Sequence, residues 1–222
     1  MVKIEAAGFP NYTAQDAARY TRLPYSTVLY WARGRDGRPP VIRAKDGLSF
    51  LNLVEIHMLG VFRRFHGVTL QKLRKVVVGL AKRYPNERHP LATRKFWTDG
   101  KSVFTEEIGK LVSLDQPGQL ALPRVVECYA ARVQWDGSAP RRLFPFTTRP
   151  EMERLEPEPR SVVIDPRVAF GRPVVAGTRI TTRALYERFE AGESMAALAT
   201  DYDIEQRQVE DAIRCEQANS AA

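Results

Sequence analysis

Apolar and polar residues recur with helical spacing over residues 13–34, and this pattern predicts two helices joined by a tight turn. Thr13 can cap the first helix, and Asp16 lies near the positive end of its dipole. Pro24 suits the start of the second helix, where no N–H is needed. Arg22 departs from the usual pattern, because turns of this kind commonly have a glycine there.

The second of these helices is amphipathic. Val28 and Trp31, three residues apart, share an apolar face. The other face carries hydroxyl groups and a guanidinium, which are groups that contact base edges and phosphates. The predicted DNA-binding residues here are Tyr25, Ser26, Thr27, Tyr30 and Arg33. The pattern is typical of a helix-turn-helix that reads DNA, although a solvated hairpin without a ligand has the same pattern.

A basic loop and two short apolar runs follow the hairpin. The runs at 41–44 and 48–50 flank Lys45-Asp46-Gly47, a turn signal, so they predict a two-stranded wing. The loop and the wing would offer further cations to phosphate or to the minor groove. These predicted DNA-binding residues are Arg35, Arg38, Arg43 and Lys45.

Two longer helices are predicted next. Asn52 and Glu55 resemble a capping box that opens a helix over 53–66. Apolar residues recur at helical spacing over 70–80 and predict another helix with a basic opposite side. That basic side consists of Lys72, Arg74, Lys75, Lys82 and Arg83. We interpret it as a solvated surface, with contact to the DNA backbone as the alternative.

Residues 10–83 resemble the MerR-like winged helix-turn-helix. The likeness rests on the small-residue helix, the Pro-Tyr-Ser-Thr-Val-x-x-Trp helix, the wing, and Leu-Ser-Phe leading into two further helices. Ligand-sensing members continue into a long dimerising coiled coil, whereas Pro85 and Pro90 interrupt this chain. Metal-sensing members need clustered thiols, which this sequence lacks. We therefore expect no metal and no cofactor.

Residues 86–150 predict a small α+β unit. Asp99-Gly100 predicts a hairpin loop between strands at 95–98 and 101–104. A strand over 111–114, a helix opened by Pro123 and a strand over 142–146 would complete the unit. Prolines and alternating charges over 151–161 predict an extended linker.

The last segment, 162–222, predicts a strand, a glycine-rich turn and three short helices. Gly171 and Gly177 bracket the turn, where a positive φ or a close backbone approach is expected. Thr181 and Ser194 can cap the first two helices. The inner face of the third helix is predicted to contain Val209, Ala212 and Ile213.

This segment resembles an antitoxin-associated domain once catalogued as of unknown function. The likeness rests on Asp165-Pro166, Gly171-Arg172-Pro173 and Gly177-Thr178-Arg179-Ile180. With the winged helix in front, the whole chain is similar to a VapB-type antitoxin paired with a PIN-like ribonuclease toxin. The resemblance implies that the protein neutralises this toxin and binds its own operator DNA to repress its operon.

The resemblance also implies a mechanism of inhibition. Ribonucleases of this class hold Mg²⁺ with a carboxylate cluster, so an inserted arginine would displace the metal or bind the carboxylate oxygens. Arg172 and Arg179 are the candidate toxin-binding residues. For Arg179, an intramolecular ion pair that fixes the turn is the alternative.

Charge divides the chain into two parts. The 222 residues carry 34 basic and 26 acidic side chains, a net charge of +8. Residues 161–222 hold 7 basic and 10 acidic side chains, so the rest of the chain carries the entire positive excess. This division favours DNA contact by the front and protein contact by the rear.

The remaining composition narrows the class of protein. Cys128 and Cys215 give no disulfide framework, and the three histidines lack metal-ligand spacing, so a non-enzymatic cytoplasmic protein is predicted. No stretch of the sequence is long and apolar enough to span a membrane. A homodimer is expected, because one recognition helix offers few contacts.

The predicted fold class is α+β and mainly helical. The predicted domains are a winged helix-turn-helix over 1–85, an α+β unit over 86–150, the linker over 151–161, and a three-helix domain over 162–222. Two alternative functions remain open. One is a ligand-responsive MerR-like transcription regulator without a toxin partner, and the other is a protein-binding scaffold.

Overall fold

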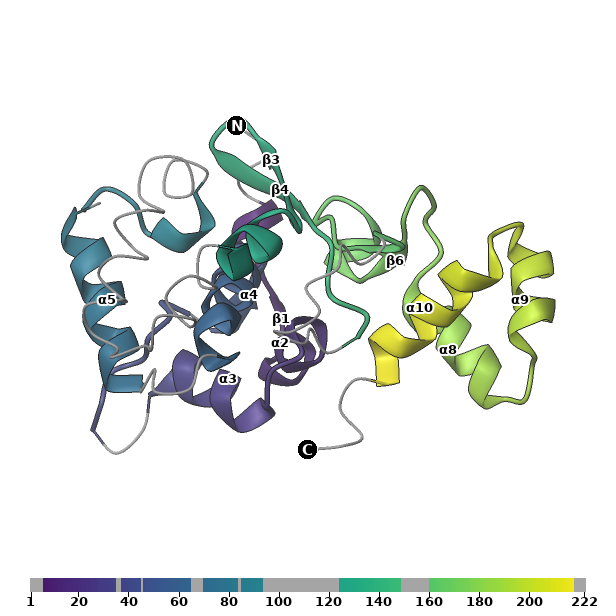
Figure 1. Cartoon of the computed structure of the whole chain (residues 1–222), viewed down its shortest axis with the longest axis horizontal. Helices are drawn as coiled ribbons and strands as arrows, with labels where there is room; N and C mark the ends of the chain where they lie inside the picture. Colours follow the sequence, from purple (N-terminus) through teal and green to yellow (C-terminus); the bar gives the residue numbers. More distant parts are fainter. Residues whose placement is uncertain are drawn as a thin grey trace.

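The computed structural model describes residues 6–34, 37–44, 46–64, 70–83, 85–93, 124–148 and 160–217. The molecule is elongated, with α5 (Leu70–Arg83) at one end and α9 (Met195–Tyr202) at the other, as Figure 1 shows. The described part is α+β and mainly helical, as predicted, and its strands form three two-stranded antiparallel sheets.

The other elements fall into a front and a rear group. The front group is β1 (Pro10–Tyr12), α2 (Ala14–Thr21), α3 (Tyr25–Arg33), β2 (Leu48–Ser49), α4 (Phe50–Arg64), η1 (Pro90–Ala92), β3 (Val133–Asp136) and β4 (Ala139–Leu143). The rear group is β5 (Val162–Val163), η3 (Ala169–Gly171), β6 (Val174–Val175), α8 (Thr182–Glu190) and α10 (Gln206–Gln217), together with α9.

The helical hairpin forms as predicted. Thr13 and Asp16 make a capping box: Asp16 N–H donates to Thr13 Oγ1 at 3.1 Å, and Thr13 N–H donates to Asp16 Oδ2 at 3.0 Å. Ala17 and Ala18 are fully buried, which lets α3 cross close to α2. Val28 and Trp31 are buried as well, so the inner face of α3 was predicted correctly.

The predicted wing is wrong in its pairing. No strand forms at 41–44, and β2 pairs instead with β1, with Pro10 opposite Ser49. The N–H groups of Val41 and Ile42 both donate to the Trp31 carbonyl, at 2.8 and 3.0 Å. The N–H groups of this segment are therefore used to bond the carbonyl of Trp31 near the end of α3, and they are not available to pair with β2.

The helix α4 begins at Phe50, three residues earlier than predicted. Its capping box is Ser49 with Asn52, because Asn52 N–H donates to Ser49 Oγ at 3.2 Å and Ser49 N–H donates to Asn52 Oδ1 at 3.1 Å. The predicted box of Asn52 and Glu55 is therefore wrong. Residues 52–61 are all buried, which makes α4 the central helix of the front group.

Part of the predicted middle unit can be compared with the structure. The predicted strands at 95–98, 101–104 and 111–114 lie outside the described residues, as does 151–159 of the predicted linker. Residues 124–130 are helical. The strand predicted at 142–146 is only partly correct: β4 ends at Leu143 and residues 144–146 are not in a strand. β4 pairs with β3 from Val133↔Leu143 to Asp136↔Ala139.

The first strand, the glycine-rich turn and the three helices of the rear group form where they were predicted, whereas β6 was not predicted. Thr181 and Ser194 cap α8 and α9 through their hydroxyl groups. Gly171 and Gly177 have φ of +76° and +84°, which is the left-handed region where glycine is favoured. Val209, Ala212 and Ile213 of α10 are buried, as predicted.

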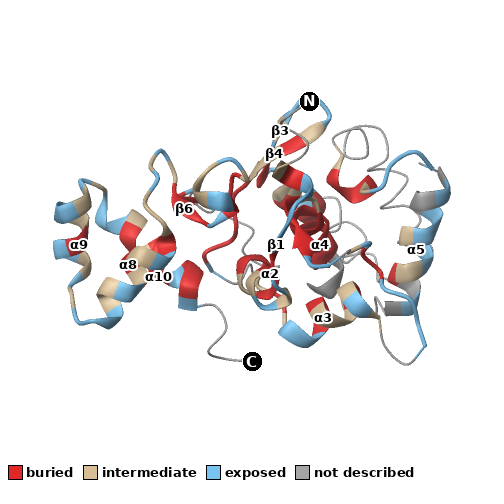
Figure 2. Ribbon diagram, turned by 180° about the vertical axis from the view of Figure 1, so that it is seen from behind, coloured by how far each residue is buried: buried red, intermediate tan, exposed pale blue. Residues whose placement is uncertain are grey.

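A single cluster of buried apolar side chains connects the front and the rear groups. It runs from Ala18 in α2 through α4 and Tyr129 to Ile164 and to Val209 in α10. In Figure 2 the buried segments extend along the same axis through both groups. The predicted boundaries at 85 and 161 therefore do not interrupt the core.

Candidate nucleic-acid interface

The outer face of α3 is open to solvent. The Tyr25 side chain is 48% exposed, and Ser26 and Arg33 are exposed as well. Tyr30 is half-buried at the side of this face. Thr27 is only 8% exposed, so we remove it from the predicted contact surface.

Tyr30 lies beside two arginines. Arg74 Nη1 donates to the Tyr30 hydroxyl at 3.0 Å, and the Arg74 guanidinium carbon lies 4.9 Å from the ring centroid. Desolvation alone would raise the pKa of the Tyr30 phenol, but hydrogen bonds from Arg74 and Arg38 outweigh it and lower the pKa. The two guanidiniums that lower this pKa are also the groups that would attract an anion such as a phosphate.

Sequence reasoning assigned Arg74 to a solvated stripe and missed this contact. Arg74 Nη2 also donates to the Pro39 carbonyl at 2.8 Å, so one side chain joins α5, α3 and the loop that carries Arg38. Nothing in the local pattern of α5 distinguishes Arg74 from its basic neighbours. The contact depends on how α5 packs on α3.

The remaining predicted DNA-binding residues do not all lie on one surface. Arg33 and Arg38 are exposed, and Arg38 joins the cluster around Tyr30. Arg43 is exposed too, but it lines a separate cavity that also contains His89. Arg35 and Lys45 lie outside the described residues. We define the α3 basic face as Tyr25, Ser26, Tyr30, Arg33, Arg38 and Arg74.

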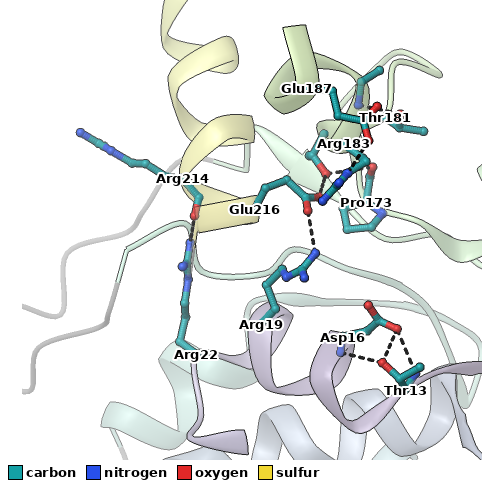
Figure 3. A network of polar contacts seen from close by, with 12 residues as sticks. Thr13, Asp16, Arg19, Arg22, Pro173, Thr181, Arg183, Glu187, Arg214 and Glu216 are labelled. Atoms are coloured by element: carbon teal, nitrogen blue, oxygen red, sulfur yellow. Dashed lines mark hydrogen bonds and ion pairs between the residues drawn. The ribbon is translucent and has the colours of Figure 1, made fainter. Parts of the chain in front are cut away.

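The hairpin helix α2 is joined to α10 by an ion pair between Arg19 and Glu216, shown in Figure 3. Arg19 Nη1 lies 2.8 Å from Glu216 Oε2, and Thr182 Oγ1 donates to Glu216 Oε1 at 2.5 Å. The Glu216 side chain is 2% exposed. A single buried carboxylate therefore connects α2, α8 and α10.

Arg22 makes a second connection at the same junction. It donates to the carbonyls of Phe146, at 2.9 Å, and Arg214, at 2.7 Å, and also to the carbonyl of Thr147. Its own backbone is left-handed, with φ of +57°. Arg22, which stands where a glycine is usual in such turns, therefore links the helical hairpin to the rear group.

The turn at η3 (Ala169–Gly171), which we call the Phe170 turn, presents an aromatic side chain to solvent. Ala169 and Phe170 have φ of +47° and +54°, and the Phe170 side chain is 87% exposed. Tyr12 of β1 donates its hydroxyl proton to the Gly171 carbonyl at 2.8 Å and so holds the turn. Two consecutive left-handed residues that are not glycine are strained, and such strain concentrates at functional sites.

The two candidate toxin-binding arginines lie near this turn. Arg172 and Arg179 are both exposed. Within the described ranges neither makes an ion pair, so the intramolecular pair considered for Arg179 is not seen there. Arg172 lies two residues after Phe170, and both line one polar hollow.

The described residues contain no group of His, Cys, Asp and Glu side chains that could hold a metal ion. No helix in the same part of the chain is long and apolar enough to span a bilayer.

The chain resembles several known proteins. Residues 162–214 match the family described as "Protein of unknown function (DUF433)". A Mycobacterium tuberculosis protein named "Putative antitoxin VapB45" is 28% identical over 232 residues, which cover 92% of this chain and 92% of that protein. "Uncharacterized protein Rv2308" from the same organism is 26% identical over 219 residues, which cover 91% of this chain and 88% of that protein.

A solved structure has the same fold. The crystal structure of Rv2018 from Mycobacterium tuberculosis aligns with a TM-score of 0.68 over 92% of this chain and 98% of that chain, at 24% identity. The named relative and the family match support an antitoxin-like family. The MerR-like helix-turn-helix stays a prediction.

Proposed function

We propose that this protein is the antitoxin of a toxin–antitoxin pair. In this proposal it binds its own operator DNA as a repressor and neutralises a PIN-like ribonuclease toxin through protein contact. The observation that carries the proposal is the end-to-end similarity to a protein named as an antitoxin. The α3 basic face supports the DNA-binding half, and the Phe170 turn supports the toxin-binding half.

The α3 basic face has the chemistry that a duplex requires. Exposed Arg33 and Arg38 can neutralise phosphates, and the hydroxyl groups of Tyr25 and Ser26 can reach base edges. Arg74 of α5 donates to the Tyr30 hydroxyl, which fixes the phenol on α3 before DNA binds. A single helix provides few base contacts, so the proposal includes a homodimer on a repeated half-site.

Fluorescence anisotropy with the DNA upstream of the protein's own reading frame tests the DNA-binding half. Arg33→Ala and Arg38→Ala should each weaken binding by about tenfold at low salt. Each lost phosphate contact should also reduce the salt slope, log Kd against log salt, by about one.

The matched control is Arg207→Ala, which removes an exposed arginine from α10, outside the α3 basic face. It should leave both the affinity and the salt slope unchanged. If all three variants behave alike, the duplex does not bind at the α3 basic face.

The Phe170 turn is the proposed anchor for the toxin. Aromatic and arginine side chains dominate the energy of protein interfaces, and here Phe170 and Arg172 are both exposed. Arg172 has no ion pair within the described ranges, so its charge is free to meet the carboxylates that the toxin class uses for Mg²⁺. Apolar contact by Phe170 would exclude water around that charge pair.

Two measurements test the toxin-binding half of the proposal. One is the growth of cells that express the neighbouring toxin gene, and the other is the affinity of the purified protein for the purified toxin. Phe170→Ala and Arg172→Ala should each weaken the complex by roughly 30-fold or more and reduce protection. Phe9→Ala, which removes an aromatic side chain that is 60% exposed elsewhere, should protect fully. Full protection by the Phe170 and Arg172 variants would exclude this turn as the anchor.

A further inference from the structure

A cavity of about 490 Å³ lies in the front group, away from the Phe170 turn. Its walls come from β1 and β2, the first turn of α4, residues 86–93, and the turn that connects β3 to β4. This volume is within the range of small-molecule sites in proteins. Neither DNA binding at the α3 basic face nor toxin binding at the Phe170 turn uses this cavity, whereas a ligand-responsive regulator would.

One wall of the cavity is a buried polar network. Glu55 Oε2 lies 2.9 Å from His89 Nδ1, and Asn52 Nδ2 donates to the same Glu55 oxygen at 3.3 Å. Asn52 and Glu55 are buried, and Asn52 also donates to the Arg43 carbonyl at 3.2 Å. Burial raises the pKa of the Glu55 carboxyl, although His89, Asn52 and Arg43 act in the opposite direction.

This network holds the His89 ring in place. In the described part of the chain, the hydrogen bonds to the His89 ring all use Nδ1. Nε2 is the other ring nitrogen, and as an N–H it can donate to a bound anion. Ser49 and Asn52, which also line the cavity, are held by the capping box of α4, so this wall is rigid before any ligand binds.

The rest of the described lining is part apolar and part basic. Outside the Glu55–His89 pair, the lining carries two arginines, Arg43 and Arg88, and one acid, Glu87, so this part of the lining has an excess of positive charge. The apolar residues that line the cavity are Ala7, Pro10, Leu51, Ala92, Ala139 and Pro140. A ligand that satisfies both parts has one negative group and a compact apolar body.

We infer that this cavity binds a small organic anion, with its carboxylate toward Arg43, Arg88 and His89 and its apolar body against Pro10, Leu51 and Ala139. A bare inorganic anion would leave the apolar wall unused, and a neutral apolar molecule would leave the arginines without a partner. A ligand here would also contact the segment 41–44, whose N–H groups cap α3. The site is independent of the proposed toxin contact.

Binding of matched acids and amides to the full-length protein tests the inference. The probes are benzoate, indole-3-acetate and hexanoate, each compared with its neutral amide at up to about 10 mM by calorimetry and by backbone NMR shifts. At least one acid should bind, roughly tenfold or more tighter than its amide. The shifts should centre on Ser49, Asn52, His89 and Ala139.

Two variants and one control complete the test. Arg88→Gln should remove most of the preference for the acid, and Ala139→Leu should weaken the acid and the amide together by filling the cavity. Arg207→Gln, at an exposed position on α10, should change neither. The inference is overturned if no acid binds, if amides bind as well as acids, or if the shifts lie outside the cavity.

Discussion

At the scale of single residues, Asp165 explains why the Asp-Pro motif matters to the fold. Its side chain is 3% exposed and accepts hydrogen bonds from Arg142 Nε and from Arg167 Nε and Nη2, each at 3.0 Å. Arg142 belongs to β4, whereas Asp165 follows β5. The carboxylate therefore joins the rear group to the β3–β4 hairpin of the front group.

This contact predicts a pH dependence of stability. Burial alone would raise the pKa of the Asp165 carboxyl, but hydrogen bonds from Arg167 and Arg142 outweigh it and hold the pKa below 3.8. A depressed carboxyl pKa stabilises the folded state above the unfolded pKa, and this stabilisation is lost as the pH falls through the folded pKa.

Asp165→Asn should therefore lower the free energy of unfolding by about 2 kcal/mol at pH 7, with a smaller loss near pH 3. Urea denaturation at pH 7, 5 and 3 measures the difference. Glu187→Gln breaks an ion pair in which the Glu187 side chain is 61% exposed, and it should change stability little at any pH. If the free energies of unfolding of wild type and Asp165→Asn differ by the same amount at all three pH values, the lowered pKa of Asp165 is contradicted.

At the scale of secondary-structure elements, the turn between α2 and α3 depends on Arg22. A left-handed backbone usually requires glycine, because a side chain there is strained. Arg22 keeps this conformation while its guanidinium donates to three carbonyls outside the hairpin. The bonds offset the strain, so the hairpin turn is stabilised by the segment after β4 and by α10.

Two substitutions separate these opposing effects. Arg22→Ala keeps the strain and removes the hydrogen bonds, so it should destabilise the protein by about 2–4 kcal/mol. Arg22→Gly removes both and should be about 1 kcal/mol more stable than Arg22→Ala. Chemical denaturation of the two variants measures both values. Wild-type stability for Arg22→Ala would mean that the carbonyl contacts contribute nothing, because that variant keeps the backbone strain.

At the scale of the whole molecule, Glu216 lies where α2, α8 and α10 meet. Next to it, Cys215 is buried, and burial raises the pKa of its thiol to about 12. The Cys215 thiol can react only when α10 moves away from its neighbours, because both burial and protonation suppress the thiolate. Its alkylation rate therefore reports how firmly α10 is held.

Glu216→Gln should raise the rate at which iodoacetamide alkylates Cys215 by roughly tenfold or more, because Arg19 loses its ionic partner. The measurement is made in a Cys128→Ser background, so that Cys215 is the one thiol. Glu210→Gln removes an exposed carboxylate from the same helix and should leave the rate unchanged. Equal rates for both variants would show that Glu216 does not hold α10.

The sequence by itself determined most of the helices and their caps. Thr13, Thr181 and Ser194 cap the helices that they were predicted to cap, and Val28, Trp31, Val209 and Ile213 are buried as their spacing indicated. These features depend on residues three or four apart, and such neighbours interact whatever the rest of the chain does.

Only the tertiary structure decided the pairings between distant segments. β2 pairs with β1 instead of the adjacent run, Arg22 bonds to Phe146 and Arg214, and Arg74 holds Tyr30. Local sequence cannot specify these partners, because many segments offer a free carbonyl or strand edge and the choice depends on how the whole core packs. The cavity beside His89 arises in the same way, since four separate parts of the chain form its walls.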